Sequence, residues 1–185
     1  MGSLDKYKVI KNFLTKEEQE LLRFYTVIKH RINQNEFDFQ QCKGLPMFYG
    51  DPIMEALMVH KAEIMEKETG LKVLPTYSCW RMYILGADLK KHKDRPSCEI
   101  SVTVQIASSS KWPLYIDGNE ITLEDGDAVI YRGCDVEHWR NEYKSDYHAQ
   151  VFLHYVDKNG PHRNNYKDGR PLFGLPASKR NQLPG

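Results

Sequence analysis

The sequence has no long apolar run and little cysteine. No stretch of about 18 apolar residues occurs, so we expect no membrane-spanning helix. The opening residues Met-Gly-Ser-Leu-Asp-Lys lack the apolar core of a signal peptide, and Lys6 stands where an N-myristoylation motif needs Ser or Thr. The 4 cysteines are scattered without a C-x-x-C pair. This argues against a zinc ribbon and favours reduced thiols in a cytoplasmic protein.

Neither sign of charge dominates. The chain has 26 Lys and Arg residues against 25 Asp and Glu residues, a net charge of +1. This balance favours neither a nucleic acid nor a membrane surface as partner. With 185 residues, no internal repeat and no change of composition along the chain, we expect a single domain over 1–185 with its own core.

The N-terminal part, residues 8–72, reads as helical support. A short strand at 8–10 leads to a helix over 15–29, which begins with the capping box Thr15-x-x-Glu18. A second helix is expected over 51–70, from the Asp51-Pro52 start to Gly70. Between them, residues 30–50 are polar and irregular, and we interpret them as a connection, with a lid as the alternative.

From residue 73 onward the pattern changes to strands. The expected strands lie at 76–85, 98–106, 112–116, 120–123, 128–131 and 147–156. Two helices followed by about seven strands predict a mainly β fold, a double-stranded β-helix (jelly roll) with two N-terminal helices packed on one sheet. The jelly-roll core would span about 73–157, and residues 158–185 would form a C-terminal strap.

The chemistry centres on His92-Lys93-Asp94. On an extended strand, residues two apart point to the same side, so the imidazole and the carboxylate can face one point. A distant second histidine would complete the 2-His-1-carboxylate triad of non-haem Fe(II) oxygenases. His138, which follows the strand at 128–131, is the best candidate. His148 and His154 are rival ligands, but they lie about 20 Å apart along one strand, so one metal cannot take both.

Tyr83, Gly86, His92 and Asp94 stand in the order Tyr-x-x-Gly…His-x-Asp. Over roughly residues 8–157 the chain resembles the Fe(II)/2-oxoglutarate-dependent oxygenases, specifically the prolyl 4-hydroxylase-like branch. It departs at Leu89, where that branch usually has Tyr. The resemblance implies that His92, Asp94 and His138 hold Fe(II). It also implies that 2-oxoglutarate and O₂ are consumed as a C–H bond of an unidentified peptide or small molecule is hydroxylated. Ascorbate is a candidate accessory cofactor.

The far carboxylate of 2-oxoglutarate needs a cation or several donors. The branch usually places Lys or Arg about ten residues after the distal histidine, where this chain has His148. We therefore expect His148 or Arg81 to hold that carboxylate, with Tyr83 beside it. From the alternation within 98–106 we expect Thr103 and Gln105 to line the pocket.

The final strand should also alternate. Its even-numbered side is expected to face inward, namely His148, Gln150, Phe152 and His154. The basic residues near the proposed ligands are interpreted as a solvated charge run, with attraction of an acidic substrate as the alternative. They are Lys90, Lys91, Lys93 and Arg95.

Two other functions fit the same residues. The first is a non-catalytic, cupin-like jelly roll that binds a metal or a small molecule. The second is a zinc hydrolase, because two histidines and an aspartate can also hold Zn²⁺ with one open position. A hydrolase also needs a general base, and Glu137 is the one near candidate.

Overall fold

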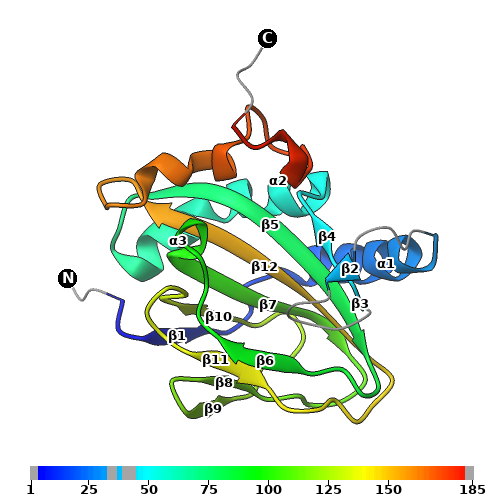
Figure 1. Ribbon diagram of the computed structural model, residues 1–185. Helices are drawn as coiled ribbons and strands as arrows, with labels where there is room; N and C mark the ends of the chain where they lie inside the picture. The colour runs from blue at the N-terminus through cyan, green and yellow to red at the C-terminus, as the bar shows by residue number, and fades with distance from the viewer. Residues whose placement is uncertain (1–3, 33–36, 39–44, 182–185) are drawn as a thin grey trace.

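The computed structural model describes residues 4–32, 37–38 and 45–181. Two antiparallel sheets face each other, and the helices cover the outer side of the larger one (Figure 1). The six strands of the larger sheet lie in the order β1 (Tyr7–Ile10), β10 (Ala128–Tyr131), β7 (Ile100–Ser108), β12 (Tyr147–Asp157), β5 (Val73–Ile84) and β4 (Phe48–Tyr49).

The smaller sheet has four strands, in the order β6 (Leu89–His92), β11 (His138–Arg140), β8 (Leu114–Ile116) and β9 (Asn119–Ile121). A separate two-stranded ribbon joins β2 (Phe37–Asp38) to β3 (Leu45–Pro46). The predicted mainly β jelly roll with a helical layer is confirmed. Strands β6 and β11 were not expected, because their sequences Leu-Lys-Lys-His and His-Trp-Arg are mostly polar and show no apolar strand pattern.

The described residues form three α-helices: α1 (Lys16–Ile32), α2 (Pro52–His60) and α3 (Ala62–Thr69). The expected capping box begins α1, since the Thr15 amide donates to the Glu18 carboxylate and the Glu18 amide donates to the Thr15 hydroxyl. The prediction of one continuous helix over 51–70 was wrong. It breaks at Lys61, whose ψ is 0°, and the buried ammonium of Lys61 donates to Glu18 of α1 over 2.6 Å.

The strands of the large sheet divide their side chains between two environments. On β7 the even-numbered residues Ile100 to Ile106 pack under the helices against Leu22 and Met54. The odd-numbered residues Ser101, Thr103 and Gln105 face the space between the sheets. The orientation predicted from the alternation is therefore confirmed for this strand, although it begins at Ile100 rather than Cys98, which lies in a 3₁₀ turn.

The last strand, β12, follows the same rule. Ala149, Val151 and Leu153 belong to the core under the helices. The even-numbered side, with His148 and His154, is buried on the inner face of the sheet. Because the inner face of a jelly roll is where a ligand can be enclosed, this register places the polar side chains where a site can form.

Residues 158–181 return to the start of α2 and to β5 (Figure 1). A buried ion pair fixes this strap, with Arg170 Nη2 lying 2.5 Å from Glu55 Oε1 and both side chains at most 1% exposed. Glu55 also accepts from the amides of Ser78 and Gly174. One carboxylate thus joins α2, β5 and the strap.

None of the helices within the described ranges is long and apolar enough to cross a membrane. Cys79, Cys98 and Cys134 are free thiols, as the scattered spacing predicted. Cys42 lies outside the described residues, and so do residues 33–36 and 39–44 of the segment 30–50 for which a lid was the alternative interpretation.

Replacing Glu55 by Ala should destabilise the protein strongly. The substitution leaves the buried Arg170 guanidinium without its carboxylate, which costs about 3–5 kcal/mol in the free energy of unfolding. Urea unfolding followed by circular dichroism measures this loss. Lys72→Ala is the matched control, because it breaks an ion pair with Glu66 in which the Lys72 side chain is 68% exposed. Equal stability losses in the two variants would contradict the structural role of Glu55.

Candidate metal centre and its pocket

Strand pairing brings the two distant histidines together. In the smaller sheet β11 runs antiparallel to β6, and His138 lies directly opposite His92. Their ring centroids are 4.3 Å apart. The two histidines are 46 positions apart in the chain, but their distance in space is set by this one pair of the ladder.

Both imidazole rings are oriented by a backbone carbonyl two residues earlier. Nδ1 of His92 lies 2.7 Å from the Lys90 oxygen, and Nδ1 of His138 lies 3.2 Å from the Val136 oxygen. A carbonyl oxygen can only accept, so Nδ1 carries a proton and Nε2 is the nitrogen that can bind a metal. This is the arrangement by which proteins fix the tautomer of a metal-binding histidine.

Asp94 faces both Nε2 atoms. Its Oδ1 lies 3.6 Å from His92 Nε2 and 3.5 Å from His138 Nε2. Burial raises the pKa of the Asp94 carboxyl, but the hydrogen bonding of His138 and His92 outweighs burial and holds that pKa well below its usual range. The carboxylate is therefore ionised at neutral pH and available as a ligand. The three potential ligand atoms lie within 4.8 Å of one another.

The position of Asp94 depends on Gly133, which the sequence analysis did not single out. The Asp94 amide donates to the Gly133 carbonyl over 2.9 Å. A Cβ at Gly133 would lie only 2.4 Å from Asp94 Oδ2 and 2.6 Å from the Ser101 hydroxyl. Because that hydroxyl also donates to Oδ2 over 2.7 Å, a side chain at residue 133 would displace both the ligand and its support.

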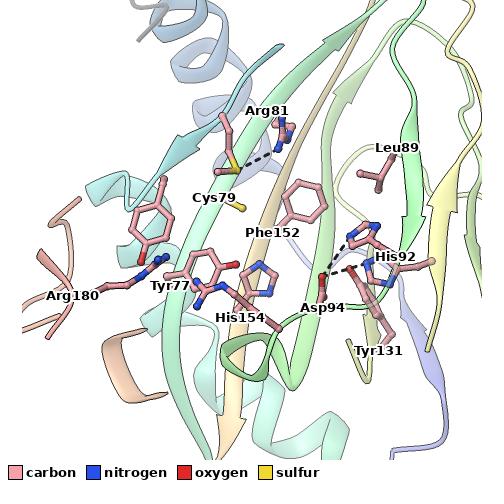
Figure 2. A pocket seen from close by; sticks show the side chains of 14 residues that line it. Tyr77, Cys79, Arg81, Leu89, His92, Asp94, Tyr131, Phe152, His154 and Arg180 are labelled. Carbon is pink, nitrogen blue, oxygen red and sulfur yellow. Dashed lines mark hydrogen bonds and ion pairs between the residues drawn. The ribbon is translucent and has the colours of Figure 1, made fainter. Parts of the chain in front are cut away.

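The three residues open onto a cavity of about 260 Å³ between the two sheets. Figure 2 shows the Asp94 carboxylate joined to both imidazole rings at one side, with Phe152 and Arg81 on other parts of the wall. Tyr131 lies behind His138, with ring centroids 4.8 Å apart. The lining thus combines one ligand cluster, aromatic rings and arginines, which suits a small acid or a substrate side chain.

A second cluster shares Asp94 with Cys98 and His154. Burial lowers the pKa of His154 to about 4, so this ring is neutral, and its Nδ1 contacts the Ser101 hydroxyl at 3.0 Å. Burial raises the pKa of the Cys98 thiol well above its usual value. A protonated thiol is a poor metal ligand. The set of His92, Asp94 and His138 is therefore the better metal site.

The solved structures most similar to this fold include two prolyl hydroxylases. The Pseudomonas putida prolyl-4-hydroxylase has a TM-score of 0.64 and 14% identity, over 80% of this chain and 91% of that chain. The viral collagen prolyl hydroxylase of Paramecium Bursaria Chlorella virus-1, solved as a 2-oxoglutarate complex, has a TM-score of 0.62 and 13% identity, over 82% and 96%.

A third relative in structure is EctD from S. alaskensis with bound Fe, with a TM-score of 0.62 and 14% identity, over 83% of this chain and 73% of that chain. No family model and no curated protein matches this chain. This chain has the fold of the Fe(II)/2-oxoglutarate oxygenases. The resemblance inferred from Tyr83, Gly86, His92 and Asp94 is confirmed at the level of the fold.

The residues expected around 2-oxoglutarate lie in different places within this oxygenase fold. Arg81 lines the cavity together with the ligand cluster, and its Nη2 contacts the Met47 sulfur at 3.3 Å. Tyr83 and His148 are fully buried beside Trp112, outside the lining. Thr103 and Gln105 also lie outside it, because Thr103 is behind Tyr131 and Gln105 donates to Asp125.

Arg140 is a buried cation that the sequence analysis missed. It is 2% exposed, and its guanidinium donates to the Trp112 carbonyl and to Gln150 Oε1. No carboxylate among the described residues pairs with it, and burial lowers its pKa to about 10. Two residues after His138 on the same strand, it lies on the same face. That spacing was the signal that could have revealed it.

His148 is neutral in this environment. Burial and the nearby Arg140 lower its pKa well below its usual value. The ring nitrogens contact the hydroxyl of Ser108 at 3.0 Å and Gln150 Oε1 at 3.1 Å. Because a neutral imidazole carries no charge, it offers a dicarboxylate at most one hydrogen bond.

The mouth of the cavity is closed on one side by the strap. The Asp168 carboxylate accepts hydrogen bonds from both Nη atoms of Arg95 over 2.6 and 2.8 Å. It also accepts from Arg180 Nε over 2.7 Å and from the Tyr49 hydroxyl over 2.5 Å. Burial raises the pKa of Asp168, but these partners and Ser97 outweigh it and hold that pKa well below its usual range. Arg95 is thus neutralised within the protein, as Lys91 is by Glu137 over 3.0 Å.

We expect His92→Ala, Asp94→Ala and His138→Ala each to weaken Mn²⁺ or Fe(II) binding by more than about a hundredfold, since even the loss of an outer hydrogen-bond partner costs 10–100-fold. Isothermal titration calorimetry of the metal measures this. Gly133→Ala should weaken binding as well, although residue 133 donates no ligand.

Two variants serve as controls for the metal site. His60→Ala changes an exposed histidine with a 72% exposed side chain and should bind metal normally. His154→Asn removes the ligand of the second cluster and should also retain the affinity. If His154→Asn abolishes binding while His138→Ala does not, the metal belongs to the second cluster.

Proposed function

We propose that the protein is an Fe(II)- and 2-oxoglutarate-dependent dioxygenase that hydroxylates a C–H bond of its substrate. The observation that carries the proposal is the convergence of two Nε2 lone pairs and one ionised carboxylate, within 4.8 Å of one another, on a cavity inside a jelly roll. Two imidazoles and one carboxylate match the donor set of non-haem Fe(II) oxygenases.

The residues present fit this metal. His92, Asp94 and His138 would hold it, and the backbone carbonyls of Lys90 and Val136 keep both rings in the tautomer that binds. When bound, Fe(II) with 2-oxoglutarate supplies oxidative decarboxylation to succinate and hydroxylation of the substrate. The Ser101 hydroxyl holds the second oxygen of Asp94, so the carboxylate presents Oδ1 alone to the ligand cluster.

Arg81 is the proposed partner of the far carboxylate of 2-oxoglutarate. Its guanidinium lines the same cavity as the ligand cluster, and it keeps its charge at every physiological pH. Arg140 adds a second buried positive charge that no acid of the described chain neutralises. The far carboxylate of a dianionic cosubstrate would form charge-assisted hydrogen bonds with the Arg81 guanidinium, which lines the cavity, whereas Arg140 lies outside the lining.

The two rival functions fit the cavity less well. A zinc hydrolase needs a general base, and Asp94 is the one carboxylate among the described residues that line the cavity. Glu137 instead pairs with Lys91, and both side chains are about half exposed. The remaining alternative is a cupin-like binding protein, which needs the same ligands but catalyses no reaction. A turnover assay distinguishes it from the dioxygenase.

The test of the proposed function is turnover of 2-oxoglutarate. With Fe(II), ascorbate and O₂ the protein should release succinate, slowly without its own substrate, and His138→Ala should release none above background. Succinate is measured by mass spectrometry, with His60→Ala as the active control. Stoichiometric metal and 2-oxoglutarate binding without any succinate, across candidate peptide and small-molecule substrates, would favour the non-catalytic jelly roll.

Binding of 2-oxoglutarate to the Mn²⁺-saturated protein should depend on Arg81 and not on pH. Arg81→Gln should weaken binding at least tenfold, about 1.4 kcal/mol, whereas His148→Gln should change it little. Because the pKa of His148 lies well below 6.5, this ring stays neutral from about pH 6.5 to 8, and the affinity should stay flat there. Calorimetric titration of 2-oxoglutarate measures both effects.

Two outcomes would assign binding of the far carboxylate of 2-oxoglutarate to a residue other than Arg81. An affinity that falls as the pH rises through this range would show that an imidazolium pairs with the dianion, and would make His148 the anchor. Weakening by Arg140→Gln but not by Arg81→Gln would assign the role to Arg140. In that case the circular dichroism spectrum of Arg140→Gln must match the parent, because Arg140 is fully buried.

A further inference from the structure

Helix α1 carries an apolar stripe on its solvent side. Of the nine large apolar residues that are exposed within the described ranges, four lie on this helix: Leu21, Phe24, Ile28 and Ile32, at 51–77% exposure. Their spacing of three, four and four residues places them on one helical face. The opposite face, with Leu22 and Thr26, is already buried against the sheet, so the stripe is not part of the core.

The stripe continues into a groove between α1 and α2. Leu21 belongs to both, because it lines this groove together with Ile53, Ala56 and Leu57 of α2. Val59, which is 46% exposed, extends the apolar surface beyond Ala56. A contiguous apolar surface of this kind on a water-exposed helix layer marks a contact site.

The charges along α1 are arranged in a way that fits a second copy of the same helix. The first turn carries Glu17 and Glu18, and the last turn carries Lys29, His30 and Arg31. Glu20 and Arg31 flank the stripe on the same side, since eleven residues are close to three full turns. Neither makes an ion pair with any residue that the structure describes.

We propose that α1 packs antiparallel against α1 of a second copy of this chain, forming a two-fold symmetric dimer. In an isologous contact, residue i of one copy contacts residue j of the other copy, and residue j of the first contacts residue i of the second. A two-fold axis that crosses the stripe midway between Phe24 and Ile28 brings Phe24 opposite the second copy's Ile28 and Leu21 close to the second copy's Ile32. The same axis pairs Glu20 with the second copy's Arg31, twice, on the rims of the contact.

The antiparallel dimer accounts for both the exposed apolar stripe and the charges that flank it. Burying the stripe removes four large apolar side chains from water, which drives the association. The two rim pairs select the antiparallel orientation, because a parallel pair would place the acidic turns together and the basic turns together. The helices cover the outer side of the large sheet (Figure 1). The candidate metal ligands line a cavity on its inner side, so the cavity stays open in the dimer.

Sedimentation velocity of the full chain, from about 1 to 100 μM, tests the dimer. We expect the parent to sediment as a dimer and Ile28→Glu to dissociate at least tenfold more readily. Ile28 is 59% exposed, so this variant should keep the parent's circular dichroism spectrum. Leu85→Glu is the matched control, since Leu85 is 69% exposed at the end of β5. A monomeric parent over the whole range, or equal effects of both variants, would overturn the proposal.

A charge exchange tests the antiparallel orientation. E20R alone and R31E alone should each weaken the dimer, because each puts like charges opposite one another. An equimolar mixture of the two single variants should form the dimer again, since every rim pair then joins opposite charges. If the mixture stays monomeric while the parent dimerises, the antiparallel pairing is wrong.

Discussion

The alternation of side chains along the large sheet is the constraint on which the rest of the structure depends. On β7 and β12 every second residue is apolar and lies under the helices, and the residues between them face the second sheet. The helices therefore supply the hydrophobic stabilisation, and the inner face is left free for polar groups. Ser101 and His154 can lie beside the candidate metal centre because Ile100 and Tyr155, next to them in the chain, belong to the core under the helices.

The candidate centre depends in turn on a short and irregular part of the chain. His92 and His138 meet through one pair of a ladder between two brief strands, and Asp94 lies just beyond the end of β6. Gly133 allows the Asp94 carboxylate and the Ser101 hydroxyl to come together, because any side chain there would collide with both. The ligands are thus held by backbone geometry, and outer contacts of this kind determine how tightly a metal binds.

Three buried charges show how differently this fold treats ionic groups. Arg170 is paired with Glu55 and fixes the strap. Asp168 is surrounded by donors from the wall of the cavity, including Arg95. Arg140, by contrast, has two neutral acceptors and no carboxylate partner among the described residues. A stabilising role explains the first two well. The third lies over the Trp112 ring at 4.6 Å, so an aromatic face and two carbonyl oxygens take the place of a carboxylate partner.

By itself, the sequence determined what local chemistry can determine: the alternation of β7, the Thr15 capping box and the His-x-Asp motif, each readable within a few residues. No spacing rule connects His138 to His92, so its choice depended on its place after the strand at 128–131 and on the resemblance to the oxygenases. Only the tertiary structure decided the break at Lys61, the close approach at Gly133 and the inward guanidinium of Arg140. Those features depend on contacts between residues far apart in the chain, and such contacts exist only once strand register and helix packing are set.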